Sequence, residues 1–222
     1  MKIFFSGALL IFLLGLKPVQ KKQRIIFFGD SITELGVQPG GYINLVDSIC
    51  KAIGESAVYE FLGSGVSGNK VYDLYLRLES DVLDKSPDRV VIYIGVNDVW
   101  HKTLLGTGTD SDKFEKFYQA IITKLLQKNI AVTVCTPAVI GEKTDNSNRH
   151  DGDLNEYSKI IRQLAEKNKL QLVDLRKSFL AYNFVNNPEN KSKGILTTDG
   201  VHLNNRGNQL VAKEMWEMLK AN

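Results

Sequence analysis

The feature that most constrains the fold of this chain is a regular alternation of short apolar segments with amphipathic helical segments. Five short, largely apolar segments are predicted to be strands, namely 24–28, 57–62, 89–94, 130–135 and 170–175. Of these, 89–94 is β-branched and continuous, which is typical of a fully buried strand. Segments with helical spacing of apolar residues follow them, namely 42–53, 71–83, 114–127, 154–168, 177–186 and 205–220. Helices that cross over between buried strands produce a parallel sheet with both faces covered. We therefore predict an α/β fold, a three-layer αβα sandwich around a five-stranded parallel sheet.

The N-terminus stands apart from this alternation. Lys2 precedes an apolar run, residues 3–16, and Lys17 closes it. The run is shorter than the roughly 20 residues that a membrane-spanning helix needs, and a charged start followed by a short apolar core is typical of a secretory signal peptide. We predict a signal peptide in residues 1–20, with an N-terminal anchor as the alternative, and hence a secreted or periplasmic protein. Residues 21–222 contain no linker or repeat and are predicted to form a single domain.

Charge and cysteine content exclude several classes of function. The chain has 28 Lys and Arg against 25 Asp and Glu, a net charge of +3, so no nucleic-acid partner is predicted. Cys50 and Cys135 are far apart, which fits neither a disulfide framework nor a metal site, and both are expected to be buried apolar residues. With 3 His and no His/Cys cluster, neither a metal site nor a cofactor is predicted.

Three segments that follow strands show no clear periodicity and are expected to be loops, namely 32–41, 96–111 and 138–152. Ligand sites in open parallel sheets lie beyond the carboxyl ends of the strands. Residues at these ends are therefore candidates for the chemistry. Four short motifs occur there or just before the last helical segment, and they contain Ser31, Gly68, Asn97, and the pair Asp199 and His202.

Each motif has a plain structural interpretation when taken alone. Ser31 could cap a helix, Asn97 could belong to a turn, and an Asp and a His three residues apart could lie on a surface loop. The glycine-rich block 63–68 also matches a dinucleotide-binding turn, and Asp98 stands after the next strand, where such a site holds a ribose. The sequence by itself leaves these interpretations open.

Taken together, the four motifs resemble those of the SGNH (GDSL-type) hydrolase superfamily of esterases and lipases. The matching segments, in order, are Gly29-Asp30-Ser31-Ile32, Gly65-Val66-Ser67-Gly68-Asn69, Gly95-Val96-Asn97-Asp98 and Asp199-Gly200-Val201-His202. Ile32 replaces the Leu that many members carry, a nearly volume-conserving change. Gly63 stands where an Asn often opens the second motif. The resemblance spans Gly29 to Asn204 and implies a flavodoxin-like topology.

The resemblance also implies a reaction and a role for each motif residue. It implies a serine ester hydrolase in which Ser31 is the nucleophile, His202 the general base and Asp199 the residue that orients the histidine. The oxyanion hole would consist of the backbone N–H groups of Ser31 and Gly68 and the side-chain amide of Asn97. No metal and no cofactor take part in this mechanism.

The motifs leave the substrate open. We expect a short-acyl ester, such as a carbohydrate acetyl ester or another small ester, because the loops show no broad apolar stripe. A lysophospholipase- or thioesterase-like acylhydrolase is one alternative, and a non-catalytic nucleotide- or sugar-binding module on the same fold is another. No membrane partner is expected beyond the possible N-terminal anchor, and the oligomeric state is not predicted. Among neighbouring residues, Asp30 is expected to tie the nucleophile turn together, His101 to lie at the surface, His150 to be solvated, and 106–110 to form a flexible rim.

Overall fold

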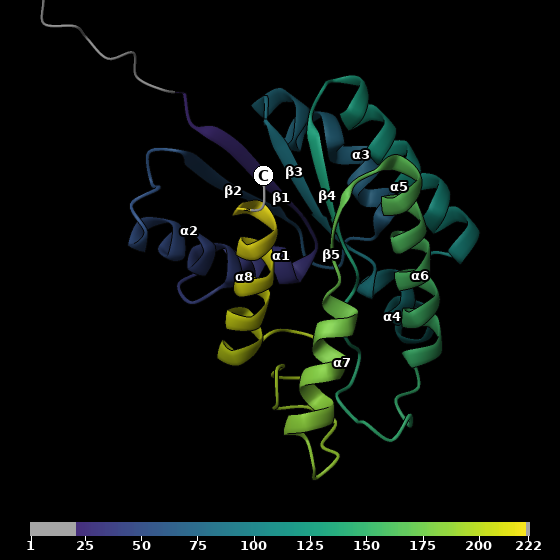
Figure 1. Ribbon diagram of the computed structural model, residues 1–222. Helices are drawn as coiled ribbons and strands as arrows, with labels where there is room; N and C mark the ends of the chain where they lie inside the picture. The colour runs from purple at the N-terminus through teal and green to yellow at the C-terminus, as the bar shows by residue number, and fades with distance from the viewer. Residues whose placement is uncertain (1–20, 221–222) are drawn as a thin grey trace, which may run out of the picture.

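The computed structural model describes residues 21–220, and it confirms the predicted α/β fold (Figure 1). The predicted signal peptide lies outside the described residues. One parallel sheet has the strand order β2-β1-β3-β4-β5. Its strands are β1 (Gln23–Gly29), β2 (Tyr59–Gly65), β3 (Arg89–Tyr93), β4 (Ala131–Cys135) and β5 (Gln171–Val173). The helices are α1 (Ser31–Gly36), α2 (Tyr42–Ala52), α3 (Val71–Asp81), α4 (Val96–Leu104), α5 (Ser111–Gln127), α6 (Asp151–Asn168), α7 (Leu175–Asn186) and α8 (Asn205–Lys220), with a short 3-10 turn at Leu83–Lys85.

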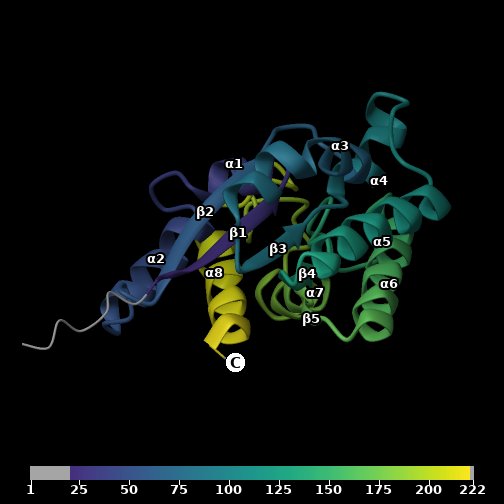
Figure 2. The same cartoon turned by 90° about the horizontal axis from the view of Figure 1, so that it is seen from above.

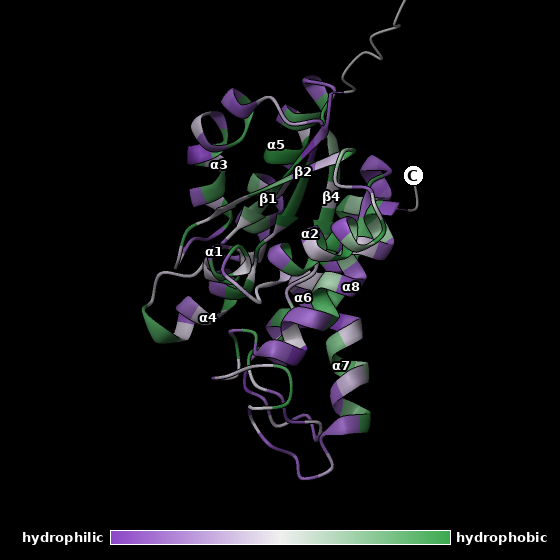
Figure 3. Ribbon diagram, turned by 90° about the vertical axis from the view of Figure 1, so that its left-hand side faces the viewer, coloured by the Kyte–Doolittle hydropathy of each residue, from purple (hydrophilic) through white to green (hydrophobic). Residues whose placement is uncertain are grey.

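The sheet lies between two layers of helices. Helices α2 and α8 pack together on one face, whereas α3, α5 and α6 cover the other face (Figure 2). All five residues of β3 are buried, as expected for a central strand covered on both sides. Hydrophobic residues gather in the strands and on the inward faces of the helices (Figure 3). Within residues 21–220, we find no helix that has the length and apolar character needed to cross a membrane.

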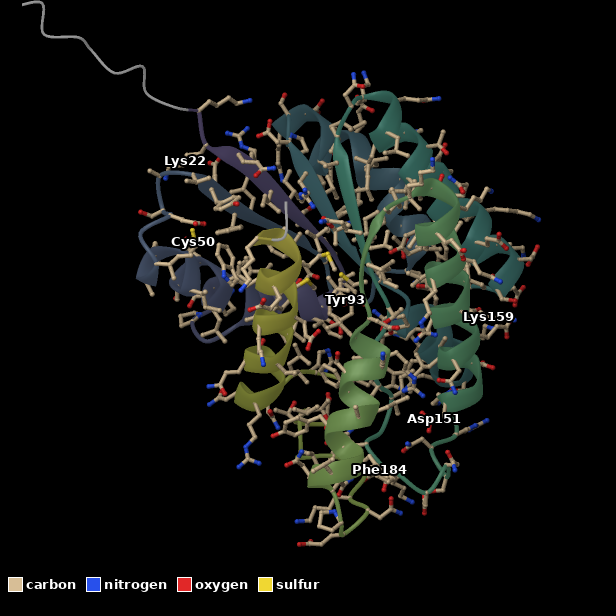
Figure 4. The ribbon with its side chains drawn as sticks, viewed as in Figure 1. Lys22, Cys50, Tyr93, Asp151, Lys159 and Phe184 are labelled. Carbon is tan, nitrogen blue, oxygen red and sulfur yellow. The ribbon has the colours of Figure 1, made fainter. Side chains whose placement is uncertain are left out.

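The strand order brings two connections together at the carboxyl edge of the sheet. The order β2-β1-β3-β4-β5 is that of flavodoxin-like folds, in which the connections after β1 and β3 leave in opposite directions. Gly29 at the end of β1 pairs with Gly65 on β2 and with Tyr93 on β3, so the three strands end at the same level. Tyr93 itself is buried in the interior (Figure 4). The segments that follow β1 and β3 therefore meet at one edge.

Two of the three predicted loops contain helices, so this part of the prediction was wrong. Helix α1 begins at Ser31 and has only 6 residues, too few to show a hydrophobic period. Helix α4 begins at Val96, and its buried face includes Asn97, Asp98 and His101 beside two valines. Because these buried side chains are polar, the usual apolar pattern of a helix is missing from the sequence. The segment 138–150 forms no helix.

Candidate active site

Ser31 is held at the carboxyl edge of the sheet by a tight turn between β1 and α1. The Asp30 carboxylate is buried and accepts a hydrogen bond from the backbone N–H of Ile32 at 3.0 Å, so Asp30 ties the turn together as expected. A Cβ on Gly29 would lie 2.3 Å from the Thr33 Oγ1 atom and 2.4 Å from the Tyr93 carbonyl oxygen. Only glycine fits at position 29, and this close packing sets the path of the chain into Ser31.

His202 and Asp199 meet Ser31 from the other end of the chain. Ser31 Oγ lies 2.9 Å from His202 Nε2, although 171 positions separate the two residues. His202 Nδ1 lies 2.7 Å from Asp199 Oδ2, and the His202 backbone N–H donates to Asp199 Oδ1 at 2.7 Å. The structure therefore brings the three predicted catalytic residues into one hydrogen-bonded chain. The His202 imidazole lies between the Ser31 hydroxyl and the Asp199 carboxylate, so it can accept a proton from Ser31 while Asp199 fixes its orientation.

The surroundings of Asp199 favour its ionised form. Partial burial of Asp199 acts to raise its pKa, but hydrogen bonds from the His202 side chain, the His202 backbone and the Val201 backbone outweigh burial and hold the pKa below the usual value. Its side chain is 47% exposed and that of His202 is 28% exposed, so the site opens to solvent. An open site of this kind can be reached by an ester carried on a large molecule.

Gly68 lies in the loop after β2, and the Asn97 side chain binds the same loop one residue later. Gly68 has a φ of 77°, which favours glycine, and the nearest atom to a Cβ built there is His101 Cε1 at 3.8 Å. The Asn97 side chain is buried and donates one N–H to the backbone carbonyl of Asn69 at 3.1 Å. This bond fixes the Asn97 amide against the glycine-rich loop. The second N–H of the amide remains for another acceptor.

The other glycines of the glycine-rich block are used for packing. A Cβ on Gly65 would lie 2.0 Å from the Glu34 backbone nitrogen, and a Cβ on Gly63 would lie 2.3 Å from a methyl carbon of Val37. These glycines let β2 approach helix α1 and the turn after it. Asp98 is buried and accepts the Val71 backbone N–H at 3.1 Å. Since this carboxyl group holds the start of α3, Asp98 is not free to bind a ribose as the dinucleotide interpretation required.

His101 is buried, which corrects the expectation that it lies at the surface. It lies one helical turn after Asn97, on the same face of α4, and the Cε1 atom of its imidazole ring points toward Gly68. The residue is 9% exposed, its Nδ1 atom has no hydrogen-bond partner within residues 21–220, and burial followed by the nearby Lys70 charge lowers its pKa. His150 is partly exposed, with Nε2 3.3 Å from Thr103 Oγ1.

The segment 106–110 is partly packed rather than a free rim. Thr109 is buried, and its backbone N–H donates to the Asp98 carbonyl at 3.1 Å, which folds the segment back onto α4. A Cβ on Gly108 would lie 2.3 Å from the Lys102 side chain. The expected loop therefore supports the helix that carries Asn97.

Glu142 is a residue of the site that the sequence did not reveal. Its buried carboxylate accepts three backbone N–H groups, from Ile195 at 2.9 Å, Leu196 at 2.6 Å and Thr197 at 3.0 Å. These three residues lead directly into the loop that carries Asp199 and His202. No motif surrounds Glu142, and a Glu in a polar loop usually signals solvent exposure, so the sequence held no indication of this contact.

Known proteins with clear similarity to this chain show its family. Residues 27–210 match the GDSL-like lipase/acylhydrolase family. An acetylxylan esterase from Geobacillus stearothermophilus is 31% identical over 175 residues, which is 71% of this chain and 78% of the relative. The crystal structure of the acetyl xylan esterase AlAXEase has a TM-score of 0.86 at 62% identity and covers 87% of this chain and 98% of its own. The crystal structure of a catalytic mutant of Axe2, an acetylxylan esterase from Geobacillus stearothermophilus, has a TM-score of 0.79 at 25% identity. It covers 90% of this chain and 95% of its own. The chain thus belongs to the GDSL-like lipase/acylhydrolase family and is a carboxylic ester hydrolase.

Proposed function

We propose that this protein is a secreted esterase that removes acetyl groups from carbohydrates of the xylan type, with Ser31 as the nucleophile. The observation that carries the mechanism is the chain of contacts from Ser31 Oγ to His202 Nε2 at 2.9 Å and from His202 Nδ1 to Asp199 Oδ2 at 2.7 Å. Such a chain turns a weakly nucleophilic hydroxyl into an attacking group.

In the proposed reaction, Ser31 Oγ attacks the acetyl carbonyl carbon while His202 Nε2 accepts the hydroxyl proton. The tetrahedral intermediate collapses, His202 returns the proton to the sugar oxygen, and acetyl-Ser31 remains. A water molecule then repeats the attack with His202 again as the base, which releases acetate and free Ser31. Asp199 stays ionised and stabilises the imidazolium, a role that suits its lowered pKa.

Three donors would meet the oxyanion of each tetrahedral intermediate. They are the backbone N–H groups of Ser31 and Gly68 and the second side-chain N–H of Asn97. The first N–H of Asn97 is already bound to the Asn69 carbonyl, so the amide is oriented before substrate arrives. Preoriented donors of this kind stabilise the transition state without reorganisation cost, and each is worth roughly 3 kcal/mol.

The carbohydrate acetyl ester is proposed from the relatives and from the shape of the site. Two relatives with at least 30% identity are acetylxylan esterases by name, one of them at 62%. The partial exposure of His202 and Asp199 supports access by a polysaccharide, because the alcohol portion of the ester would lie outside the protein.

The test is hydrolysis of acetylated xylan and of p-nitrophenyl acetate, butyrate, octanoate and palmitate, with Ser31→Ala alongside. We expect acetate release from xylan, declining turnover with longer acyl chains, and a loss of at least 10³-fold in kcat for Ser31→Ala. Activity near wild type in Ser31→Ala would disprove the mechanism. Preference for octanoate or palmitate would replace the proposed substrate with that of a lysophospholipase- or thioesterase-like acylhydrolase.

Secretion is tested separately. N-terminal sequencing of the protein recovered outside the cytoplasm should find a first residue between Leu16 and Lys21. Export with Met1 or Lys2 still present would favour the N-terminal anchor instead.

A further inference from the structure

Arg77 reaches from α3 into the space beneath the nucleophile turn. Its side chain is 15% exposed, and the guanidinium carbon lies 4.5 Å from the centre of the Phe28 ring at the end of β1. The residue lies outside all four sequence motifs and makes no contact with Ser31, His202 or Asp199 in the hydrogen-bond network of residues 21–220.

Five hydrogen bonds from this one guanidinium match its five N–H donors. Nε donates to Asn69 Oδ1 at 2.7 Å. Nη1 donates to Ser64 Oγ at 3.0 Å and to Asp81 Oδ2 at 2.6 Å. Nη2 donates to the backbone carbonyls of Gly29 at 2.7 Å and Ser64 at 3.0 Å. Only the bond to Asp81 goes to a charged group, so Arg77 is more than one half of an ion pair.

The acceptors belong to the segments that carry the proposed catalytic groups. Gly29 is two residues before Ser31. Asn69 follows Gly68, and the Asn69 backbone carbonyl also accepts the bond from Asn97. One cation thus connects the first motif with the second directly, and with the third through Asn69. These segments follow three different strands, β1, β2 and β3, and their relative position decides where the hydroxyl and the oxyanion donors lie.

We propose that Arg77 is a positioning residue that holds the Ser31 turn and the Gly68–Asn69 loop in the relative position that catalysis requires. This inference rests on the proposed serine mechanism. The planar fork of arginine is required, because an ammonium group has three donors and cannot span these acceptors together. Loss of the fork lets the oxyanion donors shift relative to Ser31. Since a shift of this kind affects the transition state more than the bound ester, kcat should change and KM should not.

The main experiment compares Arg77→Lys with Arg162→Lys on p-nitrophenyl acetate. Arg162 also donates from Nε and Nη2 to one aspartate, Asp174, at 2.8 and 2.9 Å, but it lies on α6 away from the motifs. We expect Arg77→Lys to lower kcat between about tenfold and 100-fold with KM within twofold of wild type. Arg162→Lys should retain wild-type kcat. Equal kcat values in the two variants would overturn the proposal.

A double-mutant cycle distinguishes positioning from general stabilisation. If Arg77 acts through the oxyanion donors, combining Arg77→Lys with Asn97→Ala should cost clearly less in kcat than the product of the two single effects. A fully multiplicative loss would mean that Arg77 only stabilises the fold, and would overturn the proposal.

Two further variants keep the test interpretable. Asn69→Ala leaves Arg77 in place and removes only the acceptor of its Nε, so this variant tests the proposal even where Arg77→Lys folds poorly. We expect Asn69→Ala to lower kcat, but by less than Arg77→Lys does. Wild-type kcat in Asn69→Ala would count against the link to the oxyanion loop. Ser31→Ala is measured in parallel. Activity in Ser31→Ala would refute the serine mechanism itself, whereas an inactive Ser31→Ala beside a fully active Arg77→Lys would refute only the role of Arg77.

Discussion

At the scale of single residues, buried polar side chains decide the geometry of this site. Asn97, Asp98 and Glu142 are buried, and each of them binds a backbone group of a segment distant in sequence. Burying such groups is costly unless they are hydrogen-bonded, so each one strongly favours the arrangement that satisfies it. Two predictions belong to this scale.

The first concerns Asn97. Replacement of Asn97 by Ala removes a donor that we propose acts on the oxyanion, so kcat should fall by roughly 10²- to 10³-fold while KM changes little. Steady-state kinetics on p-nitrophenyl acetate measures both constants. Asn44→Ala, at an exposed position on α2, is the matched control and should behave as wild type. A change confined to KM would show that Asn97 only binds substrate.

The second concerns the pH dependence of stability. Burial raises the pKa of Asp98 to about 7 from an ordinary value of 3.8. Between these values the folded protein holds a proton that the unfolded chain has lost, so the free energy of unfolding falls as the pH rises toward and through 7. This difference between the folded and unfolded pKa of Asp98 corresponds to at most roughly 4 kcal/mol in the free energy of unfolding. Burial raises the pKa of Asp30 to about 6, which acts in the same direction.

Asp98→Asn cannot ionise and should therefore flatten the fall in Tm between pH 5 and pH 8. Thermal unfolding followed by circular dichroism measures this. The control is Asp84→Asn, an exposed carboxyl that should leave the slope unchanged. Parallel Tm curves for Asp98→Asn and wild type would contradict a protonated Asp98 in the folded state.

At the scale of elements, the site depends on loops that are braced against each other. The segment after β4 and the loop before α8 lie at the same edge of the molecule (Figure 1). Gly141 donates its backbone N–H to the Gly200 carbonyl at 2.8 Å, and Glu142 accepts three N–H groups of residues 195–197. The Asp199–His202 loop thus gains its position from a neighbouring loop.

Glu142→Gln tests this brace. One acceptor oxygen becomes an NH₂ group that faces backbone donors, so we expect a loss of at least about 2 kcal/mol in the free energy of unfolding. We also expect a fall of roughly tenfold in kcat, because His202 would be less well placed. Chemical denaturation and kinetics give the two values. Glu156→Gln, exposed on α6, should change neither. Wild-type stability in Glu142→Gln would show that the carboxylate is dispensable.

At the scale of the whole molecule, one continuous core joins both helix layers to the sheet. Cys50 on α2 and Cys135 on β4 are both free and buried, and both belong to this core (Figure 4 labels Cys50). We predict that residues 21–222 form a single domain that unfolds cooperatively. The two thiols should then resist a thiol reagent in the native protein and become reactive at the same denaturant concentration. Mass spectrometry of labelled peptides reports each cysteine. Separate midpoints would mean that residues 21–222 contain two independent units.

The local pattern of the sequence was sufficient to predict the layers of the fold. Short apolar segments identified all five strands to within a few residues, because strand residues that pack against the covering helices are mostly apolar. The central strand β3 shows this most clearly, since all five of its residues are buried. Polar residues such as Glu60 on β2 and Gln171 on β5 lie on strands that are only partly buried. Helices α2, α3, α5, α6, α7 and α8 were found from their apolar spacing. Helices α1 and α4 were missed because neither shows a regular apolar spacing. Helix α1 has only 6 residues, and α4 buries the polar side chains of Asn97, Asp98 and His101 beside its two valines.

By itself, the sequence determined the α/β class, the strand segments and the four motifs that contain Ser31, Gly68, Asn97 and the Asp199–His202 pair. These are local properties, set by a few neighbouring residues. Only the tertiary structure decided that Ser31 and His202 touch, that His101 is buried, and that Arg77 and Glu142 bind the segments that carry the motif residues. Those contacts join positions dozens to 171 residues apart. They depend on the strand order and on the satisfaction of buried donors and acceptors, which no local pattern encodes.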